Sequence, residues 1–302
     1  MSKKDYCYYK VKKNYKVFPS AYACLPKDNS QALTKKGWVS FNQLKIDDEI
    51  MTFNLNEDYL EFQKVKNIHE YDNAKVNTAR SGNTSYMFEC TDNHEWIFKS
   101  KSTRGNLYKK TKKGYYKQKF SDFIDLNSNK HIKVSSKYNG GKDIVLGDFL
   151  KYGTNWIEFI VNCSHAQRES WFYSAIVYDG NQMKKQDSNR VLTKDYCQSF
   201  GFKQKDEIHT QAVALCAFLR GSTVGINKGE NINNLSIVSN KELKNSSNIK
   251  KTSERVTDVW CPEVENGAWV TKQSIDNYDV ITITGNSAAI AKCRKKKAKK
   301  KK

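Results

Sequence analysis

Residues 36–53 read KGWVSFNQLKIDDEIMTF, and this stretch decides the fold class. Two runs rich in aromatic and aliphatic residues, 37–39 and 49–53, flank a polar segment that ends in the Asp47-Asp48 pair. Runs of this kind that are separated by turn-forming residues are typical of β-strands. The stretch therefore predicts a short strand, a turn and a second strand.

The β pattern continues on both sides of a section with mixed patterns. Alternating apolar and polar residues predict strands at 60–66, 85–90, 255–260, 268–272 and 278–284. Between them we expect helices at 144–152, 168–178 and 209–219, and strands within 191–203 and at 234–238. The order predicts a mostly β domain that is interrupted by a small α/β insert.

The net charge of +20 is concentrated at the two ends of the chain. Residues 1–23 carry a net charge of +5 and residues 287–302 carry +9, which leaves +6 for the middle section, residues 24–286. The two ends are alike in composition, and the middle section differs from both. Blocks of like charge stay solvated and suit polyanions such as nucleic acids, although a lysine-rich end also serves as a solubilising tail.

Composition argues against several classes of protein. The chain has no run of about 18 apolar residues that could span a membrane. Its first residues, MSKKDYCYYKVKK, lack the apolar region of a secretion signal, and the eight cysteines form no CxxC pair. We therefore expect an intracellular protein (in the cytoplasm, nucleoid or virion) with neither structural zinc nor a disulfide framework.

Both boundaries of the middle section carry residues that can break a peptide bond. Cys24 places a thiol beside the preceding carbonyl group, and attack by this thiol converts the peptide bond into a thioester. Asn286 can attack its own carbonyl carbon through the side-chain amide, and the Ser287 hydroxyl can take over an acyl group. Taken alone, Cys24 also fits a small buried apolar residue.

A third element is the TDNH sequence at residues 91–94, which follows the strand predicted at 85–90. The Thr91 hydroxyl can bond a carbonyl oxygen or an oxyanion, and His94 can protonate a departing amine. Because these residues are three apart at the end of a strand, both can reach one peptide group. The alternative interpretation is an ordinary turn.

The order of these elements resembles that of an intein, a self-splicing domain of the Hint (Hedgehog/intein) β-fold. The resemblance rests on Cys24, the stretch at 36–53, the TDNH sequence and a strand that runs into the TGNS sequence at 284–287. It implies host segments at 1–23 and 287–302, a splicing domain in two parts at 24–135 and 254–286, and an insert at 136–253.

The resemblance also implies the chemistry, with the chain as its own substrate in cis and no cofactor. Excision of residues 24–286 would join 1–23 to 287–302. The implied roles are Cys24 as first nucleophile, Thr91 and His94 as helpers of its acyl shift, Asn286 as the residue that cyclises, and Ser287 as acyl acceptor.

Three positions depart from the usual intein pattern. Gly285 stands where inteins usually carry a histidine before the final asparagine, and Cys261 stands where they usually carry an aspartate. Gly267 stands where they usually carry a further histidine a few residues after that aspartate, so asparagine cyclisation lacks both of its usual histidines. A minority of inteins, often called class three, uses a cysteine at the second of these positions as a nucleophile. In that group it comes with a tryptophan just after the TxxH motif and a threonine two residues before the final asparagine, the positions of Trp96 and Thr284 here.

Class-three inteins normally lack the N-terminal cysteine that this chain keeps at Cys24. The role of Cys261 therefore stays open between a second acyl acceptor, a proton relay and a buried thiol beside Trp260.

The insert contains FYSAIVYDG at residues 172–180, which resembles the motif of the LAGLIDADG homing endonucleases. By that resemblance Asp179 would bind Mg²⁺ for DNA cleavage, and Gly180 is the glycine that follows the acid. The sequence contains one copy of the motif, so cleavage of both DNA strands would need a partner chain. The alternative is a packed helix in an inactive insert.

Three functions follow for testing. The leading hypothesis is a precursor that splices itself. The second is a small basic, nucleic-acid-binding or virion-type host protein that carries a splicing-impaired intein, and the third is a DNA endonuclease in the insert. They do not exclude one another, because host and insert could each be functional.

Overall fold

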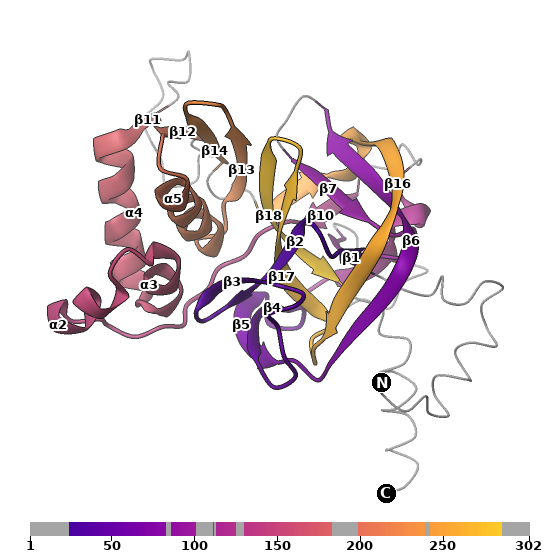
Figure 1. Cartoon of the computed structure of the whole chain (residues 1–302), viewed down its shortest axis with the longest axis horizontal. Coiled ribbons are helices and arrows are strands. Elements are labelled where there is room, and N and C mark those ends of the chain that lie inside the picture. The colour runs from indigo at the N-terminus through magenta and orange to yellow at the C-terminus, as the bar shows by residue number, and fades with distance from the viewer. Residues whose placement is uncertain are drawn as a thin grey trace, which may run out of the picture.

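The computed structural model describes residues 24–82, 86–100, 111, 113–124, 130–182, 199–238 and 242–285. β-Strands make up the larger part of the regular structure, and the α-helices are confined to one section of the described chain (Figure 1). The prediction of a mostly β protein with a small α/β insert is confirmed.

The described strands form antiparallel sheets, in which one long sheet extends from the insert into the β body. The first sheet consists, in spatial order, of β1 (Leu25–Pro26), β16 (Ile249–Glu263), β6 (Asn67–Ser81) and β7 (Met87–Cys90). The second consists of β15 (Leu243–Asn245), β10 (His131–Lys133), β8 (Glu95–Lys99) and β9 (Tyr115–Lys119). The long sheet consists of β11 (Gly180–Gln182), β12 (Ser199–Gln204), β14 (Asn233–Val238), β13 (Thr223–Lys228), β18 (Tyr278–Gly285), β17 (Ala268–Ile275), β2 (Ser30–Thr34), β4 (Glu49–Asn54) and β5 (Tyr59–Lys64), with β3 (Gly37–Ser40) paired to β2.

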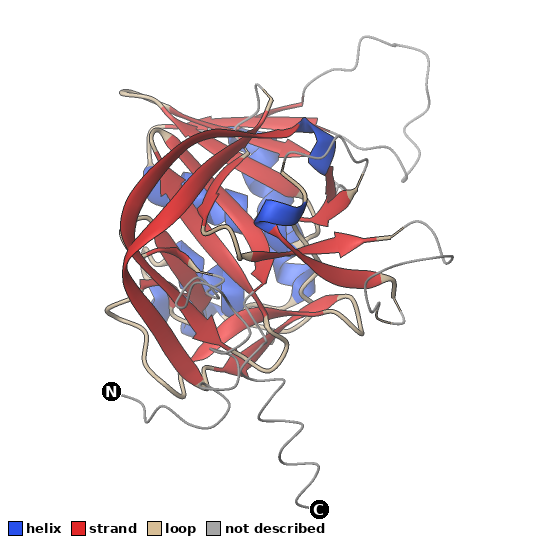
Figure 2. Ribbon diagram, turned by 90° about the vertical axis from the view of Figure 1, so that its right-hand side faces the viewer, coloured by secondary structure: helices blue, strands red, loops and turns tan. Residues whose placement is uncertain are grey.

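The long strands β6 and β16 form the ladder on which the first sheet is built. They pair from Ile249↔Ser81 to Glu263↔Asn67, and the register shifts twice along the way. Irregularities of this kind bend a strand and increase its twist. Figure 2 shows the two strands curving together across the β body. Both strands therefore have an exposed part at the surface of the body and a buried part in its interior.

The insert combines helices with the far end of the long sheet. Its helices are α2 (Leu146–Phe149), α3 (Trp156–Asn162), α4 (His165–Asp179) and α5 (Glu207–Leu219). The Asp206 side chain caps α5 by accepting the N–H groups of Ile208 and His209. The helices predicted at 168–178 and 209–219 are confirmed as α4 and α5, and α2 continues as a 3₁₀ turn to Tyr152.

The insert is attached to the β body through a shared ladder. Strand β13 pairs with β18 through Ile226↔Asp279 and Asn227↔Tyr278. Strand β15 pairs with β10, and the predicted boundary at 253/254 falls inside β16.

Among the described residues, no helix is long and apolar enough to cross a membrane.

Candidate active site

Cys24 lies beside Cys261 at the edge of the first sheet. Strand β1 pairs with β16 through Leu25↔Trp260 and Pro26↔Val259, and the continuation of this register places Cys24 level with Cys261. The two sulfur atoms are 3.3 Å apart, and the Cys24 thiol donates to Cys261 Sγ. Both side chains are buried, so the sulfur pair is shielded from water.

The two thiols differ in acidity because of this contact. Burial, together with the contact to Cys261, raises the pKa of Cys24 well above its ordinary value. The hydrogen bond from Cys24 lowers the pKa of Cys261, and the charge of His69 acts in the same direction, whereas burial and the charge of Glu263 act against it. In the pair, Cys261 is therefore the proton acceptor and Cys24 the proton donor.

The TDNH turn holds Cys24 by its backbone. Thr91 Oγ1 accepts the Cys24 N–H at 3.2 Å, and the Thr91 N–H donates to the Cys24 carbonyl oxygen at 3.2 Å. The His94 N–H closes the turn on the Thr91 carbonyl oxygen at 3.0 Å. Asn77 Nδ2 anchors the turn by donating to Asp92 Oδ1 at 2.8 Å. The Cys24 nitrogen is the atom that leaves when the peptide bond before Cys24 breaks, so Thr91 contacts a reacting atom.

The other end of the same turn contacts the end of β18. His94 Nε2 forms a hydrogen bond with Thr284 Oγ1, and both side chains are fully buried. The His94 ring packs edge to face against Trp96, with centroids 5.4 Å apart. Trp96 is itself packed on Phe88. Trp96 and Thr284 thus hold the imidazole from two sides.

Gly285 follows Thr284 at a place without room for a side chain. It pairs with Ala268 at the end of the β17–β18 ladder. A Cβ atom at Gly285 would lie 2.6 Å from the carbonyl oxygen of Glu95, the first residue of β8. The backbone of β8 therefore disfavours any side chain at position 285.

The structure thus brings together Cys24, Thr91, His94, Trp96, Cys261, Thr284 and Gly285. Asn286 and Ser287 lie outside the described residues, as do both basic ends, and their roles stay predictions. Gly285 is bonded to Asn286, so the described chain leads directly to the second boundary.

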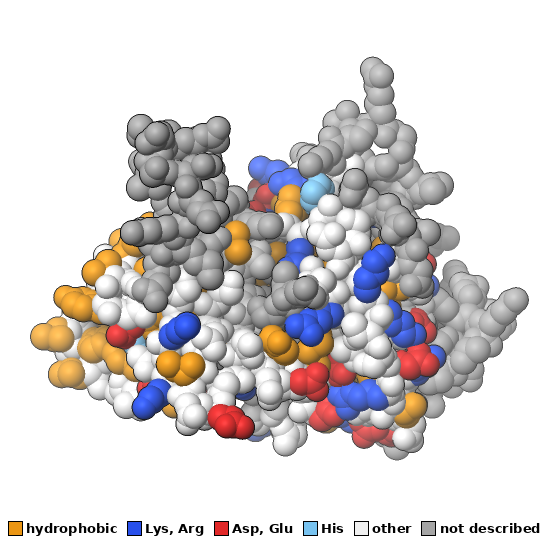
Figure 3. All heavy atoms as spheres, turned by 90° about the horizontal axis from the view of Figure 1, so that it is seen from above, with side chains coloured by type: hydrophobic (Ala, Val, Ile, Leu, Met, Phe, Trp, Pro, Cys, Tyr) orange, Lys and Arg blue, Asp and Glu red, His pale blue; other side chains and the backbone are white. Residues whose placement is uncertain are grey.

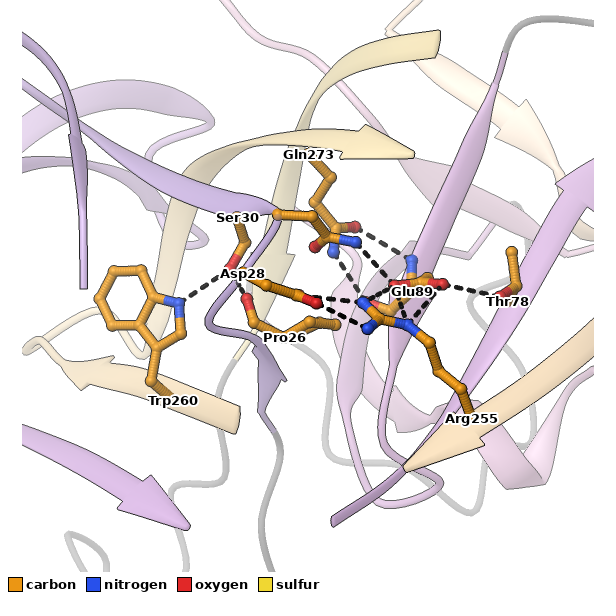
Figure 4. Close-up of polar contacts among 9 residues, drawn as sticks. Pro26, Asp28, Ser30, Thr78, Glu89, Arg255, Trp260 and Gln273 are labelled. Atoms are coloured by element: carbon orange, nitrogen blue, oxygen red, sulfur yellow. Dashed lines mark hydrogen bonds and ion pairs between the residues drawn. The ribbon is translucent and has the colours of Figure 1, made fainter. Parts of the chain in front are cut away.

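A polar network that runs from the exposed Asp28 to the buried Glu89 fixes the segment that follows Cys24 (Figure 4). Arg255 donates to both carboxylate oxygens of Asp28 at 2.6 and 2.9 Å and to Glu89 Oε2 at 2.7 Å. Gln273 Nε2 donates to the Glu89 carbonyl oxygen at 2.9 Å. Trp260 Nε1 donates to Ser30 Oγ at 2.8 Å, and that hydroxyl donates to the Pro26 carbonyl oxygen. The segment that begins at Cys24 is thereby tied to β7, β16 and β17.

The two residues of the insert motif lie elsewhere. Asp179 is the exposed last residue of α4, and Gln204 Nε2 is 3.5 Å from its Oδ2. A Cβ atom at Gly180 would lie 2.5 Å from the Ile176 carbonyl oxygen, so this glycine allows the chain to turn closely past the helix end. Within the described ranges, no group of three His, Cys, Asp or Glu side chains could hold a metal ion. By themselves these residues do not form a Mg²⁺ site.

Sequence reasoning missed the neighbours of Cys261 on the β6–β16 ladder. His69 is the register partner of Cys261, and His69 Nε2 is 3.0 Å from Glu263 Oε2. It also missed Arg255 with its carboxylate partners Asp28 and Glu89. These contacts join residues that are far apart in the sequence, so no local sequence pattern predicts them.

Comparisons with known proteins found structural likeness only. No protein-family model matches the chain, and no curated protein is significantly similar to it in sequence. Three solved structures are similar over 87% of this chain. One is a GSH-linked, splice-inactive variant of the AceL NrdHF class 3 split intein, at 9% identity, 97% coverage of that chain and a TM-score of 0.35.

The other two are a mutant of an Ssp DnaB mini-intein variant (14% identity, 99% coverage, TM-score 0.35) and that variant itself (14%, 93%, 0.34). At these values, function has to be inferred from the site itself.

Proposed function

We propose that residues 24–286 are a self-splicing domain of the intein type, which excises itself and joins residues 1–23 to 287–302. One observation carries this proposal: a single four-residue turn contacts both boundaries of the segment. Thr91 bonds the backbone of Cys24, and His94 bonds Thr284. A stable core alone does not require a thiol, a hydroxyl and a buried imidazole at the two ends of one segment.

The first step is an acyl shift at Cys24. The thiol attacks the carbonyl carbon of Ala23, a C–S bond forms, and the C–N bond to Cys24 breaks. Thr91 Oγ1 already bonds the nitrogen that leaves, so its hydroxyl is placed to support the proton transfer that the amine needs. Burial excludes water from the sulfur pair, which protects a thioester from hydrolysis.

The later steps take place at the second boundary. Ser287 attacks the thioester and takes over residues 1–23 as an ester, and Asn286 then cyclises and releases the segment. An O-to-N shift converts the ester into a peptide bond. His94 is held by Thr284 two residues before Asn286, so it is the described group best placed to serve this boundary in the absence of a histidine at Gly285.

The test is expression of the full chain followed by mass spectrometry of intact products. The proposal predicts a free 24–286 segment and a ligated 39-residue product. Cys24→Ala removes the first nucleophile and Asn286→Ala blocks the final release, so each variant loses the ligated product. A wild-type chain that stays as precursor over time contradicts splicing and favours the splicing-impaired alternative.

A second candidate function is a DNA endonuclease in the insert. Helix α4, two strands, α5 and two further strands follow one another, and Asp179 ends the first helix in solvent. Helix α4 also presents exposed Tyr173, Val177 and Tyr178, and hydrophobic side chains gather on the insert's part of the surface in Figure 3. An exposed apolar helix face that ends in a lone carboxylate fits a unit that needs a partner chain to complete its site.

The endonuclease is tested by incubating the chain with Mg²⁺ and DNA that encodes the joined host segments. Active wild-type protein and inactive Asp179→Asn protein would support this function. Splicing should be unchanged in Asp179→Asn, because Asp179 lies outside the site at Cys24. Equal cleavage by both proteins, or cleavage by neither, would exclude a nuclease that depends on Asp179.

A further inference from the structure

His69, Cys261 and Cys24 stand in one row across three neighbouring strands. Strand β16 lies between β1 and β6 in the first sheet. His69 is the register partner of Cys261 on one side, and Cys24 is level with Cys261 on the other. Directly opposite residues of antiparallel strands point to the same face, with Cβ atoms about 4.5–5.5 Å apart. Cys261 is therefore flanked by a thiol on one side and an imidazole on the other.

Glu263, on the same strand as Cys261, is the carboxylate next to His69. It lies two residues after Cys261, so its side chain points to the same face of the sheet. Glu263 Oε2 is 3.0 Å from His69 Nε2, and 16% of the Glu263 side chain and 22% of the His69 side chain remain exposed. A carboxylate at this distance in a partly buried place favours the positively charged imidazolium. Cys261 thus has as its register partner an imidazole that is held by a carboxylate and lies 3.5 Å from Asn67 Nδ2, and these are residue types found in sites that activate a cysteine.

We propose that His69, held in place by Glu263, favours the thiolate of Cys261, and that Cys261 takes the proton from Cys24 when Cys24 attacks the carbonyl carbon of Ala23. The proposal deepens the splicing function and rests on it. Cys261 is here a catalytic proton acceptor, because its sulfur contacts the attacking sulfur at 3.3 Å. His69 and Glu263 are positioning residues, because they act through Cys261.

The step balances without a co-reactant. Cys261 thiolate accepts the Cys24 thiol proton, and the Cys24 sulfur forms the C–S bond of the thioester. The C–N bond breaks, the nitrogen of Cys24 takes up the proton that Cys261 received, and Cys261 returns to the thiolate. Burial makes it difficult for the Cys24 thiol to lose its proton to water. A neighbouring proton acceptor therefore makes the attack by this sulfur easier.

The arrangement gives the first step a defined pH dependence. The titratable groups that face Cys261 in the described chain are Cys24 before β1, His69 on β6 and Glu263 on β16. Removal of the His69 charge leaves Cys261 in a buried place with only the contact from Cys24 to favour its thiolate. More alkaline solution is then needed to form the acceptor.

The experiment measures the first step alone in the full chain that carries Asn286→Ala and Ser287→Ala. Excess dithiothreitol releases residues 1–23 from the thioester, and the release rate is followed from about pH 6 to about pH 10. In this background we compare the parent with His69→Gln, Glu263→Gln, Cys261→Ala and Cys24→Ala. His131→Gln is the matched control, because His131 is also a strand histidine but lies on β10, in the second sheet. Circular dichroism confirms that each variant is folded.

We expect His69→Gln to slow release at least about tenfold at neutral pH and to move the profile about one unit toward alkaline pH, with the rate recovering there. Glu263→Gln should move the profile less than His69→Gln, because the Glu263 carboxylate favours the imidazolium of His69 while its own negative charge raises the pKa of Cys261. Cys261→Ala should slow release over the whole range, and His131→Gln should match the parent.

Three results would overturn the inference. His69→Gln could match the parent, or it could slow release equally at all pH values, which indicates a structural role. Release could also persist in Cys24→Ala, which would make Cys261 the first nucleophile. A parent that releases nothing at any pH instead contradicts the splicing function itself.

Discussion

The two boundaries of the middle section are built very differently. Cys24 is contacted by a second thiol, that of Cys261, and by Thr91, which bonds both the Cys24 N–H and the Cys24 carbonyl oxygen. Around Gly285, the described contacts include the ladder pairing with Ala268, tight packing against Glu95 and a hydrogen bond between His94 and the preceding residue, Thr284. Among the described residues, reactive side chains are therefore concentrated around the first boundary.

This difference predicts that the reactions at the two boundaries proceed at different rates. Preorganised donors and acceptors around a reacting peptide lower its barrier, whereas a boundary without its usual acid or base has to rely on position alone. We therefore expect a fast acyl shift at Cys24 and a slow release at Asn286. The thioester should accumulate before the chain is ligated.

The largest effect is expected from Cys24→Ala. Loss of the nucleophile should reduce release of residues 1–23 at least about a thousandfold and leave no ligated product. Cys24→Ser keeps the shape of the side chain with a poorer nucleophile, so it should retain a slow residual reaction. Release by dithiothreitol and by hydroxylamine separates a thioester from an ester. Rapid dithiothreitol release from Cys24→Ala would show that the first boundary does not depend on this residue.

His94→Ala tests whether one turn serves both boundaries. Because the imidazole contacts Thr284 while its turn holds Cys24, both the acyl shift and the asparagine step should slow by about a hundredfold. Thr284→Val removes only the hydroxyl and should affect the second boundary more than the first. The two rates are read from the same time course of intact masses. Equal slowing by Thr284→Val at both ends would contradict the assignment of Thr284 to the second boundary.

Gly285→Ala tests the close packing at the second boundary. Its Cβ atom would lie 2.6 Å from a backbone oxygen, so we expect the free energy of unfolding to fall by about 1–3 kcal/mol. Release at Asn286 should also slow, because the end of β18 has to shift. Gly147→Ala is the control, since a Cβ atom there meets nothing within 4 Å. Unchanged stability and rate in Gly285→Ala would show that the packing is not a constraint.

Arg255→Met is expected to have the smallest effect on splicing and a measurable effect on stability. It leaves the buried Glu89 carboxylate without its cation, which should cost about 1–2 kcal/mol of unfolding free energy. The half-exposed Asp28 contributes the smaller share, because solvent screens it. Lys251→Met is the matched control on β16, where an exposed ion pair is lost and a smaller change is expected.

The same pair makes a pH prediction. The hydrogen bond from Arg255 lowers the pKa of Asp28 in the folded chain. A carboxyl group whose pKa is lower in the folded chain than in the unfolded chain stabilises the fold at pH values above its unfolded pKa. This stabilisation is lost as the pH falls through the folded pKa. The stability difference between wild type and Arg255→Met should therefore narrow below about pH 4. A difference that stays constant down to acid pH would contradict this role of Asp28.

The sequence predicts the elements of the fold better than it predicts the contacts between them. Strand and turn patterns are local, so the β class, the insert and helices α4 and α5 followed from the residues themselves. The seven-residue helix α3 has too few turns to show a clear period, and it was not predicted. His69 and Glu263 escaped notice because their relation to Cys261 depends on the register of two long strands with two shifts. Gly285 could be seen to replace a histidine, but the carbonyl group that excludes a side chain there comes from β8.

The most direct measurement of the central claim is tandem mass spectrometry of the protein after expression and digestion. Splicing predicts a peptide in which Ala23 is followed directly by Ser287, together with a 24–286 segment that ends in a cyclised Asn286. The new peptide should be absent from Cys24→Ala. If only the continuous sequences Ala23-Cys24 and Asn286-Ser287 are found in the wild type, even after long incubation, the account of a self-splicing domain is wrong.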